Sequence, residues 1–421
     1  FEAANVAADH QQLMMTLMKS TAKKHGFLCL LHEKPFAGVN GSGKHVNWSV
    51  GNSTQGNLLD PGSTPHENLL FLLFCGAVIR GVHLHGPLLR AVIATASNDH
   101  RLGANEAPPA ILSVYLGDQL EKVVTDIKDD NIHTSTSGGE MDLGLSQILN
   151  FERDPGDRNR TSPFAFTGNR FEFRAVGSSQ SVSGPLVAMN TILADSLNWI
   201  AVNLETALEG GASQAEAVVT VLRELMTEHG NVVFGGDGYS EEWHRVAVEE
   251  RGLKNIPTTA DALPALQEAS VVELFSSTGV LSPIELKSRF EVYSEQYLLS
   301  IEVEARLVIN MARTMICPAA TAYLASLAST AQSMSAMGIE LDSTIPGFVA
   351  SRLNEMIGAT ASLETALAKE EFASTEEHMQ FFATDIRALM DEVRAAADAL
   401  EGYVSDEMWP LPKYQEMLYI K

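Results

Sequence analysis

Four arginines lie within seventeen residues of an otherwise acidic chain: Arg158, Arg160, Arg170 and Arg174. Arginine binds phosphate and carboxylate groups through two parallel N–H donors, so such a cluster could hold an anionic ligand. Arg170, Glu172 and Arg174 alternate with two phenylalanines, and this period of two predicts a strand with the charged groups on one face. The segment is therefore either an anion site or a structural ladder of ion pairs.

A second segment with possible chemistry is GVNGSGKH, residues 38–45. It nearly matches a phosphate-binding loop, but His45 stands where that loop needs Ser or Thr to hold magnesium. The residues that follow, VNWSV, favour a strand over a helix. One interpretation is a glycine-rich turn that lets the backbone approach a ligand, with His45 as a metal ligand on the next strand. A plain hairpin turn is the alternative.

The third segment is SNDHRLGANEAPPAI, residues 97–111. Pro108 and Pro109 suit the first turn of a helix, which places Arg101 and Glu106 on a loop between two helices. Loops on a rigid scaffold often carry function. The residues alone nevertheless favour a solvated surface loop over a functional one. A fourth segment, at 233–244, is explained structurally by a strand start, a glycine-rich turn and a helix capped by Ser240.

The elements that must position these residues change in kind along the chain. Apolar periodicity predicts a helix at 5–25, and helical structure at 66–96 with a break near Gly81–Pro87. A further helix is predicted at 109–128. Strands are predicted at 27–31, 46–50 and 171–176, with loops at 131–142 and 150–163. Almost everything after Gly184 reads as helix. The sequence thus predicts an α+β region at 1–280 and a helical region at 281–421.

Composition excludes several classes of protein. The 421 residues are 45% hydrophobic and 19% charged, which rules out global disorder. Acidic residues outnumber basic ones by 53 to 29, so a nucleic acid is not an expected partner. The apolar run Leu69–Ile79 predicts a buried helix that is too short for a membrane span, and no membrane partner is expected. Three scattered cysteines predict reduced thiols and a cytoplasmic protein.

Three ordered motifs together resemble glutamine synthetase, and more narrowly its type III class: NGSGKHVNWS at 40–49, HRLGANEAPPAI at 100–111 and FTGNRFEFRAVGSS at 166–179. The resemblance implies a curved antiparallel sheet backed by helices, with an α-helical C-terminal extension. It implies ligation of ammonium to L-glutamate with ATP and Mg or Mn, through γ-glutamyl phosphate, in a dodecameric parent enzyme. A γ-glutamyl-amine ligase and a non-catalytic assembly of the same fold are the alternatives.

Positions within these motifs imply roles for individual residues. The resemblance assigns metal binding to His45 and Glu172, glutamate binding to Asn40, Gly41, Arg101 and Arg174, nucleotide binding to Ser49, Arg160 and Arg170, and catalysis to Glu106 and Arg160. Ala165 stands where the shorter class has a second arginine, which leaves Arg158 or Arg170 to take its place. The other metal-binding glutamates of the family would precede Phe1, so we expect a longer parent enzyme.

Overall fold

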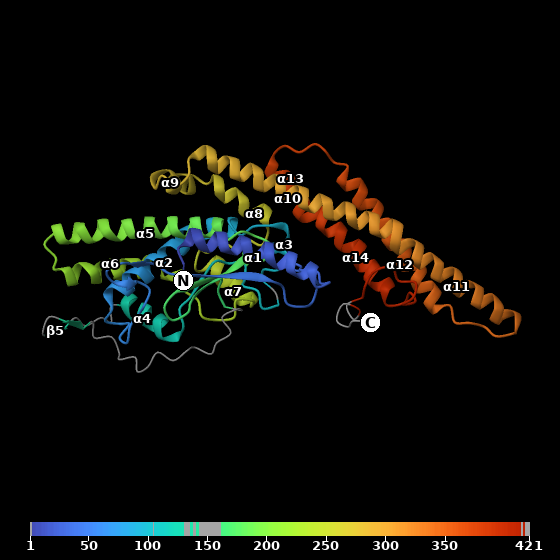
Figure 1. Ribbon diagram of the computed structural model, residues 1–421, viewed down its shortest axis with the longest axis horizontal. Helices are drawn as coiled ribbons and strands as arrows, with labels where there is room; N and C mark the ends of the chain where they lie inside the picture. Colours follow the sequence, from blue (N-terminus) through green and yellow to red (C-terminus); the bar gives the residue numbers. More distant parts are fainter. Residues whose placement is uncertain are drawn as a thin grey trace. The chain divides into compact units, whose positions relative to one another are not determined.

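The computed structural model describes residues 2–103, 105–129, 135–137, 140–142, 161–413 and 416. The chain forms two compact units, Phe1–Glu291 and Val292–Lys421. In Figure 1 the first unit runs from blue to yellow and the second from orange to red. The first unit contains the strands and all the predicted site residues that the structure describes.

A four-stranded sheet carries two of the three motifs. Its strands are β1 (Gly43–Trp48), β4 (Val114–Tyr115), β7 (Phe164–Phe166) and β8 (Phe171–Gly177), in the order β1-β8-β7-β4. β8 pairs antiparallel with both β1 and β7, whereas β4 pairs parallel with β7. The predicted α+β class is confirmed, with one parallel edge in a sheet expected to be antiparallel. Short antiparallel pairs join β2 (Gly51–Asn52) to β3 (Gly56–Asn57), and β5 (Ser135–Ser137) to β6 (Glu140–Asp142).

Aromatic side chains fix β8 in the core. Phe171 and Phe173 are fully buried, and the ring of Phe164 on β7 lies 5.7 and 5.2 Å from theirs. Burial of each ring stabilises the fold by about 1.5–3 kcal/mol. The predicted strand is confirmed, but Arg174 on its other face is also fully buried. β8 is therefore covered on both faces at that position, unlike the half-exposed strand that the alternation predicts.

Helices α2 (Leu69–Ala91), α5 (Ser183–Glu209) and α6 (Gln214–His229) pack against one another, and Figure 1 shows α5 and α6 side by side. The side chain of Asn68 caps α2 by accepting the amide of Phe71. The helix kinks at His85, where φ is −118° and ψ is 25°, because Pro87 lacks an N–H and its ring clashes with the preceding turn. The predicted break in this helix is confirmed.

Shorter helices complete the first unit: α1 (Ala4–Lys24), α3 (Ala96–Asp99), α4 (Asp118–Lys128), α7 (Glu241–Glu249), α8 (Thr259–Ala262), α9 (Ala269–Ser277) and 3-10 turns at Gly230–Val232 and Leu263–Gln267. The helix α10 (Pro283–Met311) contains the boundary between the units. Ser240 accepts the amide of Trp243 at the start of α7, so the predicted cap is confirmed.

The second unit is helical, with α11 (Cys317–Ala336), α12 (Thr344–Leu367), α13 (Thr375–Phe381) and α14 (Arg387–Glu401). π-helical turns lie at Ala312–Ile316 and Phe382–Ile386. Val349, Met356 and Leu363 recur every seven residues on α12 and are fully buried. This spacing puts them on one face of the helix, which packs along α14.

Two predicted elements are wrong. Residues 27–31 form no strand, and Phe27 and Leu28 are 66% and 83% exposed. A β-prone run needs a neighbouring strand to bond with, and the described residues supply none there. The helix predicted at 109–128 begins only at Asp118. Pro108 and Pro109 instead start an extended segment that leads into β4, because a residue before proline disfavours the helical conformation.

Three helical stretches are long and apolar enough to cross a membrane by length and composition alone: α2, α5 and residues 283–336. The windows of α2 and α5 are 61% and 50% buried within the structure, and that of 283–336 is 17% buried. The buried helix predicted from Leu69–Ile79 is confirmed. The inference that this helix is too short to span a membrane was wrong, because the helix continues beyond the apolar run, through Pro87 to Ala91.

Candidate functional site

His45 and Glu172 lie side by side on neighbouring strands. The pairing of β1 with β8 brings His45 Nδ1 to 3.0 Å from Glu172 Oε1. The register of the two strands shifts between Lys44 and Val46, so His45 on β1 lies opposite a bulge on β8, where residues 174 and 175 face this one residue. The His45 side chain is 41% exposed. An imidazole and a carboxylate beside solvent are donors that a divalent metal can use, although no group of three possible metal ligands exists among the described residues.

A cleft of about 1040 Å³ opens beside this pair, between α1 and β1. Ser49 and Asn47 line it together with His45, and Ser49 Oγ donates to Asn57 Oδ1. Arg170 Nε donates to Asn47 Oδ1 over 3.1 Å, which holds that guanidinium next to the same strand. The structure thus gathers the predicted metal and nucleotide residues His45, Ser49 and Arg170 around one strand. The volume suits a ligand of nucleotide size.

Asn40 and Glu106 meet across the two loops that carry them. Asn40 Nδ2 donates to Glu106 Oε2 over 2.8 Å, and both residues are exposed. Asn105 and Glu106 have φ angles of 50° and 64°, in the left-handed region that non-glycine residues rarely adopt. Such strain persists only where the surroundings impose it and is frequent at ligand sites. The loop expected between two helices instead joins α3 to β4.

Arg101 lies beneath the glycine-rich loop and is 4% exposed. Its Nη2 donates to the carbonyl of Arg174 over 2.9 Å, and its Nη1 donates to Asn98 Oδ1 over 3.2 Å. Burial lowers the pKa of Arg101 to about 10, against the attraction of Glu33. A Cβ added at Gly43 would overlap the Arg101 guanidinium. Only glycine at position 43 is therefore compatible with this position of Arg101.

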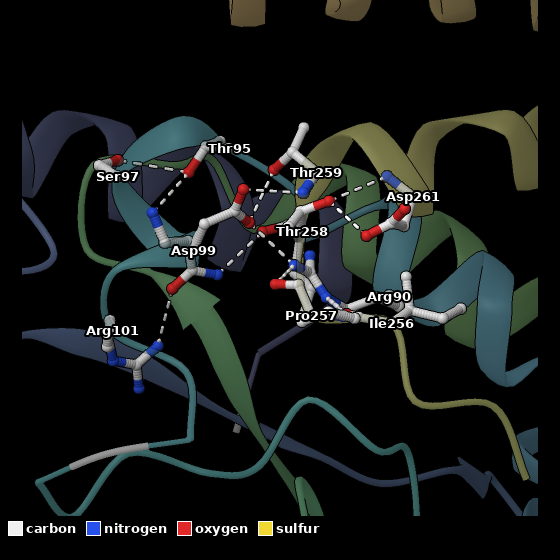
Figure 2. Close-up of polar contacts among 12 residues, drawn as sticks. Arg90, Thr95, Ser97, Asp99, Arg101, Ile256, Pro257, Thr258, Thr259 and Asp261 are labelled. Atoms are coloured by element: carbon white, nitrogen blue, oxygen red, sulfur yellow. Dashed lines mark hydrogen bonds and ion pairs between the residues drawn. The ribbon is translucent and has the colours of Figure 1, made fainter. Parts of the chain in front are cut away.

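A buried ion pair anchors the helix that precedes Arg101, as Figure 2 shows. Arg90 Nη2 lies 2.9 Å from Asp99 Oδ1, and both side chains are almost fully buried. Arg90 also donates to the carbonyls of Ile256 and Pro257, over 2.9 and 3.0 Å. Thr259 donates its amide to Asp99 Oδ2 over 2.7 Å. Burial raises the pKa of Asp99, and Arg90 opposes that effect.

Asn98, next to Asp99, connects this anchored helix to Arg101 by hydrogen bonds. Thr95 caps α3 by accepting the amide of Asn98 over 3.1 Å (Figure 2). The Asn98 side-chain amide donates to the carbonyls of Ile93 and Ala175, over 2.9 and 3.0 Å, while its oxygen accepts from Arg101. One side chain thus joins the end of α2, the strand β8 and Arg101. These links fix the predicted glutamate-binding arginine to the sheet.

Of the two predicted arginines Arg174 and Arg160, only Arg174 lies among the described residues. Arg174 is fully buried and donates to the carbonyl of Ser162, so it does not share a solvated face with Glu172 as the alternation predicts. The prediction fails because β8 is covered on both faces at Arg174. Arg160 and Arg158 lie outside the described residues. Gly41 lies directly over Arg101, and a Cβ there would be 3.1 Å from Arg101 Cγ.

Two charged residues to which the sequence motifs assign no role hold the turn after β8: Lys44, which is half-buried, and Glu33, which is fully buried. Lys44 Nζ donates to the carbonyls of Ser178 and Gln180, the latter over 2.6 Å. It holds the turn after β8 rather than a phosphate. Glu33 is fully buried and accepts from Ser179. No pattern near Glu33 in the sequence distinguishes a buried carboxylate from an exposed one.

Two family models match the chain. The glutamine synthetase catalytic domain matches residues 1–113, and the glutamine synthetase C-terminal domain matches residues 217–335. His45, Arg101 and Glu106 lie in the first match. Arg90 and Asp99 also lie there, whereas their partners Ile256, Pro257 and Thr259 lie in the second.

Curated relatives match over the whole length of the chain. The type-3 glutamine synthetase of Dictyostelium discoideum is 42% identical over 430 residues, covering 100% of this chain and 58% of the relative. Glutamine synthetases of Bacteroides fragilis and Butyrivibrio fibrisolvens are 39% and 37% identical over 100% of this chain, and 59% and 60% of their own lengths. The chain therefore spans about three fifths of these relatives. With this similarity and both family models, the chain belongs to the glutamine synthetase family.

Proposed function

We propose that this chain supplies part of the active site for the ATP-dependent ligation of ammonia to the γ-carboxylate of L-glutamate, which yields glutamine, ADP and phosphate. The observation that carries the proposal is the contact of His45 with Glu172 at the edge of the 1040 Å³ cleft. This pair combines metal-binding groups with space for a nucleotide. The names of the relatives, all glutamine synthetases, support the same reaction.

His45 and Glu172 are the residues of this chain that would hold a divalent cation, Mg²⁺ or Mn²⁺. Such a cation, when bound, neutralises charge on phosphate oxygens during phosphoryl transfer. The donor set fits this use, since an imidazole nitrogen and a carboxylate oxygen lie 3.0 Å apart. His45 leaves its remaining side open to solvent and the cleft. The other ligands would come from outside the described residues or from ATP and glutamate.

Glu106 is the proposed general base. Its carboxylate accepts from Asn40 over 2.8 Å, which orients the group while leaving it exposed at the loop. An oriented carboxylate can take a proton from ammonium, and the resulting ammonia attacks the acyl phosphate. Arg170, held by Asn47, is proposed to face the nucleotide, and Arg160 to stabilise charge on the transferred phosphoryl group.

Arg101 and Arg174 are proposed to act on the glutamate side. Arg101 uses donors on the carbonyls of Arg174 and Val176, over 2.9 and 3.3 Å, and so holds the strand that carries Glu172. A carboxylate approaching above Gly43 would meet a guanidinium that is already fixed. Preorganisation of this kind lowers the entropic cost of binding. Arg101 is therefore proposed both to position β8 and to attract the substrate carboxylate.

Self-association into a dodecamer in the cytoplasm is proposed on the resemblance to type III enzymes. The molar mass measured by light scattering tests it, and a monomer under conditions of full activity would contradict it.

The reaction is tested by ADP release and glutamine formation with glutamate, ammonium, ATP and magnesium. The assay is run on this chain and on a version extended upstream to the length of its relatives. We expect glutamine from the extended version. Replacing ammonium by polyamines is the control for the acceptor. ADP release without glutamine, or no ADP release from either version, would contradict the proposal.

A further inference from the structure

Glu33 connects two of the site's segments. It lies in the irregular segment between α1 and β1, and its side chain is fully buried. Glu33 Oε1 accepts from the amide and the hydroxyl of Ser179, over 2.9 and 2.6 Å. Its main-chain carbonyl accepts the amide of Ser42 over 2.7 Å. One residue thus holds both the turn after β8 and the loop before His45.

The approach of Glu33 to these segments leaves no room for side chains. A Cβ at Gly177 would overlap Glu33 Oε1, and a Cβ at Gly41 would lie 2.6 Å from the Glu33 carbonyl. Both positions are glycine in this sequence. Close packing of this kind transmits small displacements, because a densely packed interior has little free space to absorb them.

The charge of Glu33 is balanced by two cations of the site. Glu33 Oε2 is buried and has no hydrogen-bond partner among the side chains and backbone that the structure describes. A buried carboxylate needs an opposite charge close by. Glu33 attracts both Arg101 and Lys44, and this attraction opposes the lowering of their pKa values by burial. Removing the negative charge would therefore leave the buried Arg101 and the half-buried Lys44 without this attraction.

Lys44 completes the hold on the turn at 177–180. Its ammonium donates to the carbonyls of Gly177, Ser178 and Gln180. Glu33 accepts from the N–H and O–H groups of Ser179 in the same turn. Lys44 thus binds the carbonyl groups of this turn, and Glu33 binds its N–H and O–H groups. Both charges come from the segment that ends in the glycine-rich motif.

We propose that Glu33 is a positioning residue for glutamate binding, which sets the loop at 40–43 and the turn at 177–180 around Arg101. This inference rests on the proposed function. Two of the residues assigned to glutamate lie against Glu33: Gly41, over its carbonyl, and Arg101, which its charge attracts. Among the described residues assigned to the metal and the nucleotide, His45 and Glu172 are held by the pairing of β1 with β8 and by their own contact, and Arg170 is held by Asn47. A substitution at Glu33 should therefore change the KM for glutamate far more than the KM for ATP.

The test compares Glu33→Gln with Glu33→Asp, and uses Glu224→Gln on the exposed side of α6 as the matched control. In the active extended protein, Glu33→Gln should raise the KM for glutamate at least tenfold and change the KM for ATP less than twofold. Glu33→Asp keeps the charge and should give an intermediate KM for glutamate. Equal increases in both KM values would overturn the proposal. If Glu33→Gln fails to fold, the same comparison in Glu33→Asp decides.

A second measurement separates this inference from the proposed function. Amide hydrogen exchange of this chain without substrates should be at least tenfold faster at 40–43 and 177–180 in Glu33→Gln, with α5 and α12 unchanged. If the wild-type protein makes no glutamine but exchange responds in this way, the proposed reaction fails and the positioning role of Glu33 stands. Unchanged exchange at both segments would overturn the positioning role, whatever the reaction.

Discussion

The candidate site has an exposed rim and a buried floor, and the two are built differently. The rim consists of Asn40, His45 and Glu106, which are exposed and make few contacts besides one another and Glu172. The floor consists of Arg90 and Arg101 with their partners, and each guanidinium makes several hydrogen bonds to main-chain carbonyls or acids. Rim residues can be changed without leaving a buried charge unpaired, whereas floor residues cannot.

This difference shows that one family motif can contain both a buried structural residue and an exposed residue available for catalysis. Arg101 and Glu106 are five positions apart in HRLGANEAPPAI, yet Arg101 is 4% exposed and Glu106 lies on an exposed loop. A substitution at Arg101 should lower both stability and glutamate binding, whereas a substitution at Glu106 should lower catalysis with little effect on stability. Measurements of stability and of binding on matched variants can break or sharpen this division.

The largest expected effect is on the floor, in Asp99→Ala. Removing this carboxylate leaves Arg90 buried without its ion-pair partner, which typically costs about 3–5 kcal/mol. The free energy of unfolding, measured with urea, should fall by that amount. Asp9→Ala, at an exposed position on α1, is the control and should change it little. A loss below about 1 kcal/mol for Asp99→Ala would remove the distinction between floor and rim.

Acidic pH should lower the free energy of unfolding of the first unit, because His229 is buried in its neutral form. Its Nδ1 lies 2.9 Å from His83 Nδ1, and burial, His83 and Arg80 lower the pKa of His229 to about 4. An unfolded histidine has a pKa of about 6.5, so the unfolded chain binds more protons between pH 6.5 and 4. The free energy of unfolding should therefore fall by about 2 kcal/mol at pH 5 relative to neutral pH.

The charged groups around this pair include Arg80 and Glu228, whose carboxylate lies 3.7 Å from His229 Nε2. His229→Gln should keep a hydrogen-bonding group beside His83 while removing the titration. Urea unfolding at pH 5 and 7.5 would then differ less in the variant than in the wild type. An identical pH dependence in both would mean that the loss of stability arises elsewhere.

Gly43→Ala tests the contact between the rim loop and the floor. The added methyl group would overlap the Arg101 guanidinium, and overpacking of a buried site typically costs about 1–3 kcal/mol. Gly184→Ala is the matched control, because a Cβ at that helical position meets nothing within 4 Å. Thermal unfolding should show a lower Tm for Gly43→Ala only. Equal Tm values would mean that the loop is free to move away from Arg101.

The smallest effect on stability is expected on the rim, in His45→Gln. The side chain is 41% exposed, so the free energy of unfolding should change by less than about 1 kcal/mol. Binding of Mn²⁺, measured by calorimetry, should weaken at least tenfold if His45 is a metal ligand. Glu205→Gln, exposed on α5, is the control. Unchanged Mn²⁺ affinity would contradict the assignment of His45.

Local patterns predicted much of the fold. The helix at the N-terminus, the break before Pro87 and the cap at Ser240 follow from residue types within a few positions of each site, and all three are confirmed. The alternation at 171–176 likewise predicts β8. These features depend on short-range sterics and hydrogen bonds, which the sequence expresses directly.

Burial depends on distant segments, and there prediction from the sequence was weaker. Nothing near Arg174 in the sequence indicates that its face of β8 is covered, and nothing near Arg90 points to the carbonyls of Ile256 and Pro257. The run at 27–31 has β propensity, but a strand needs a partner as well. The same holds for Glu33, whose burial depends on Gly177 and Ser179.

The anchorage of Arg90 has a consequence for exchanging parts between relatives. The hydrogen bonds of Arg90 and Asp99 connect the two stretches that the family models match. Arg90 and Asp99 lie in the stretch at 1–113, and their partners Ile256, Pro257 and Thr259 lie in the stretch at 217–335. A chimera joined anywhere between these stretches would take the guanidinium and its carbonyl acceptors from different parents. The acceptors at Ile256 and Pro257 are main-chain carbonyls, which a parent of the same fold supplies whatever its side chains, so the side-chain contact that such a chimera must preserve is the one between the Thr259 hydroxyl and Asp99.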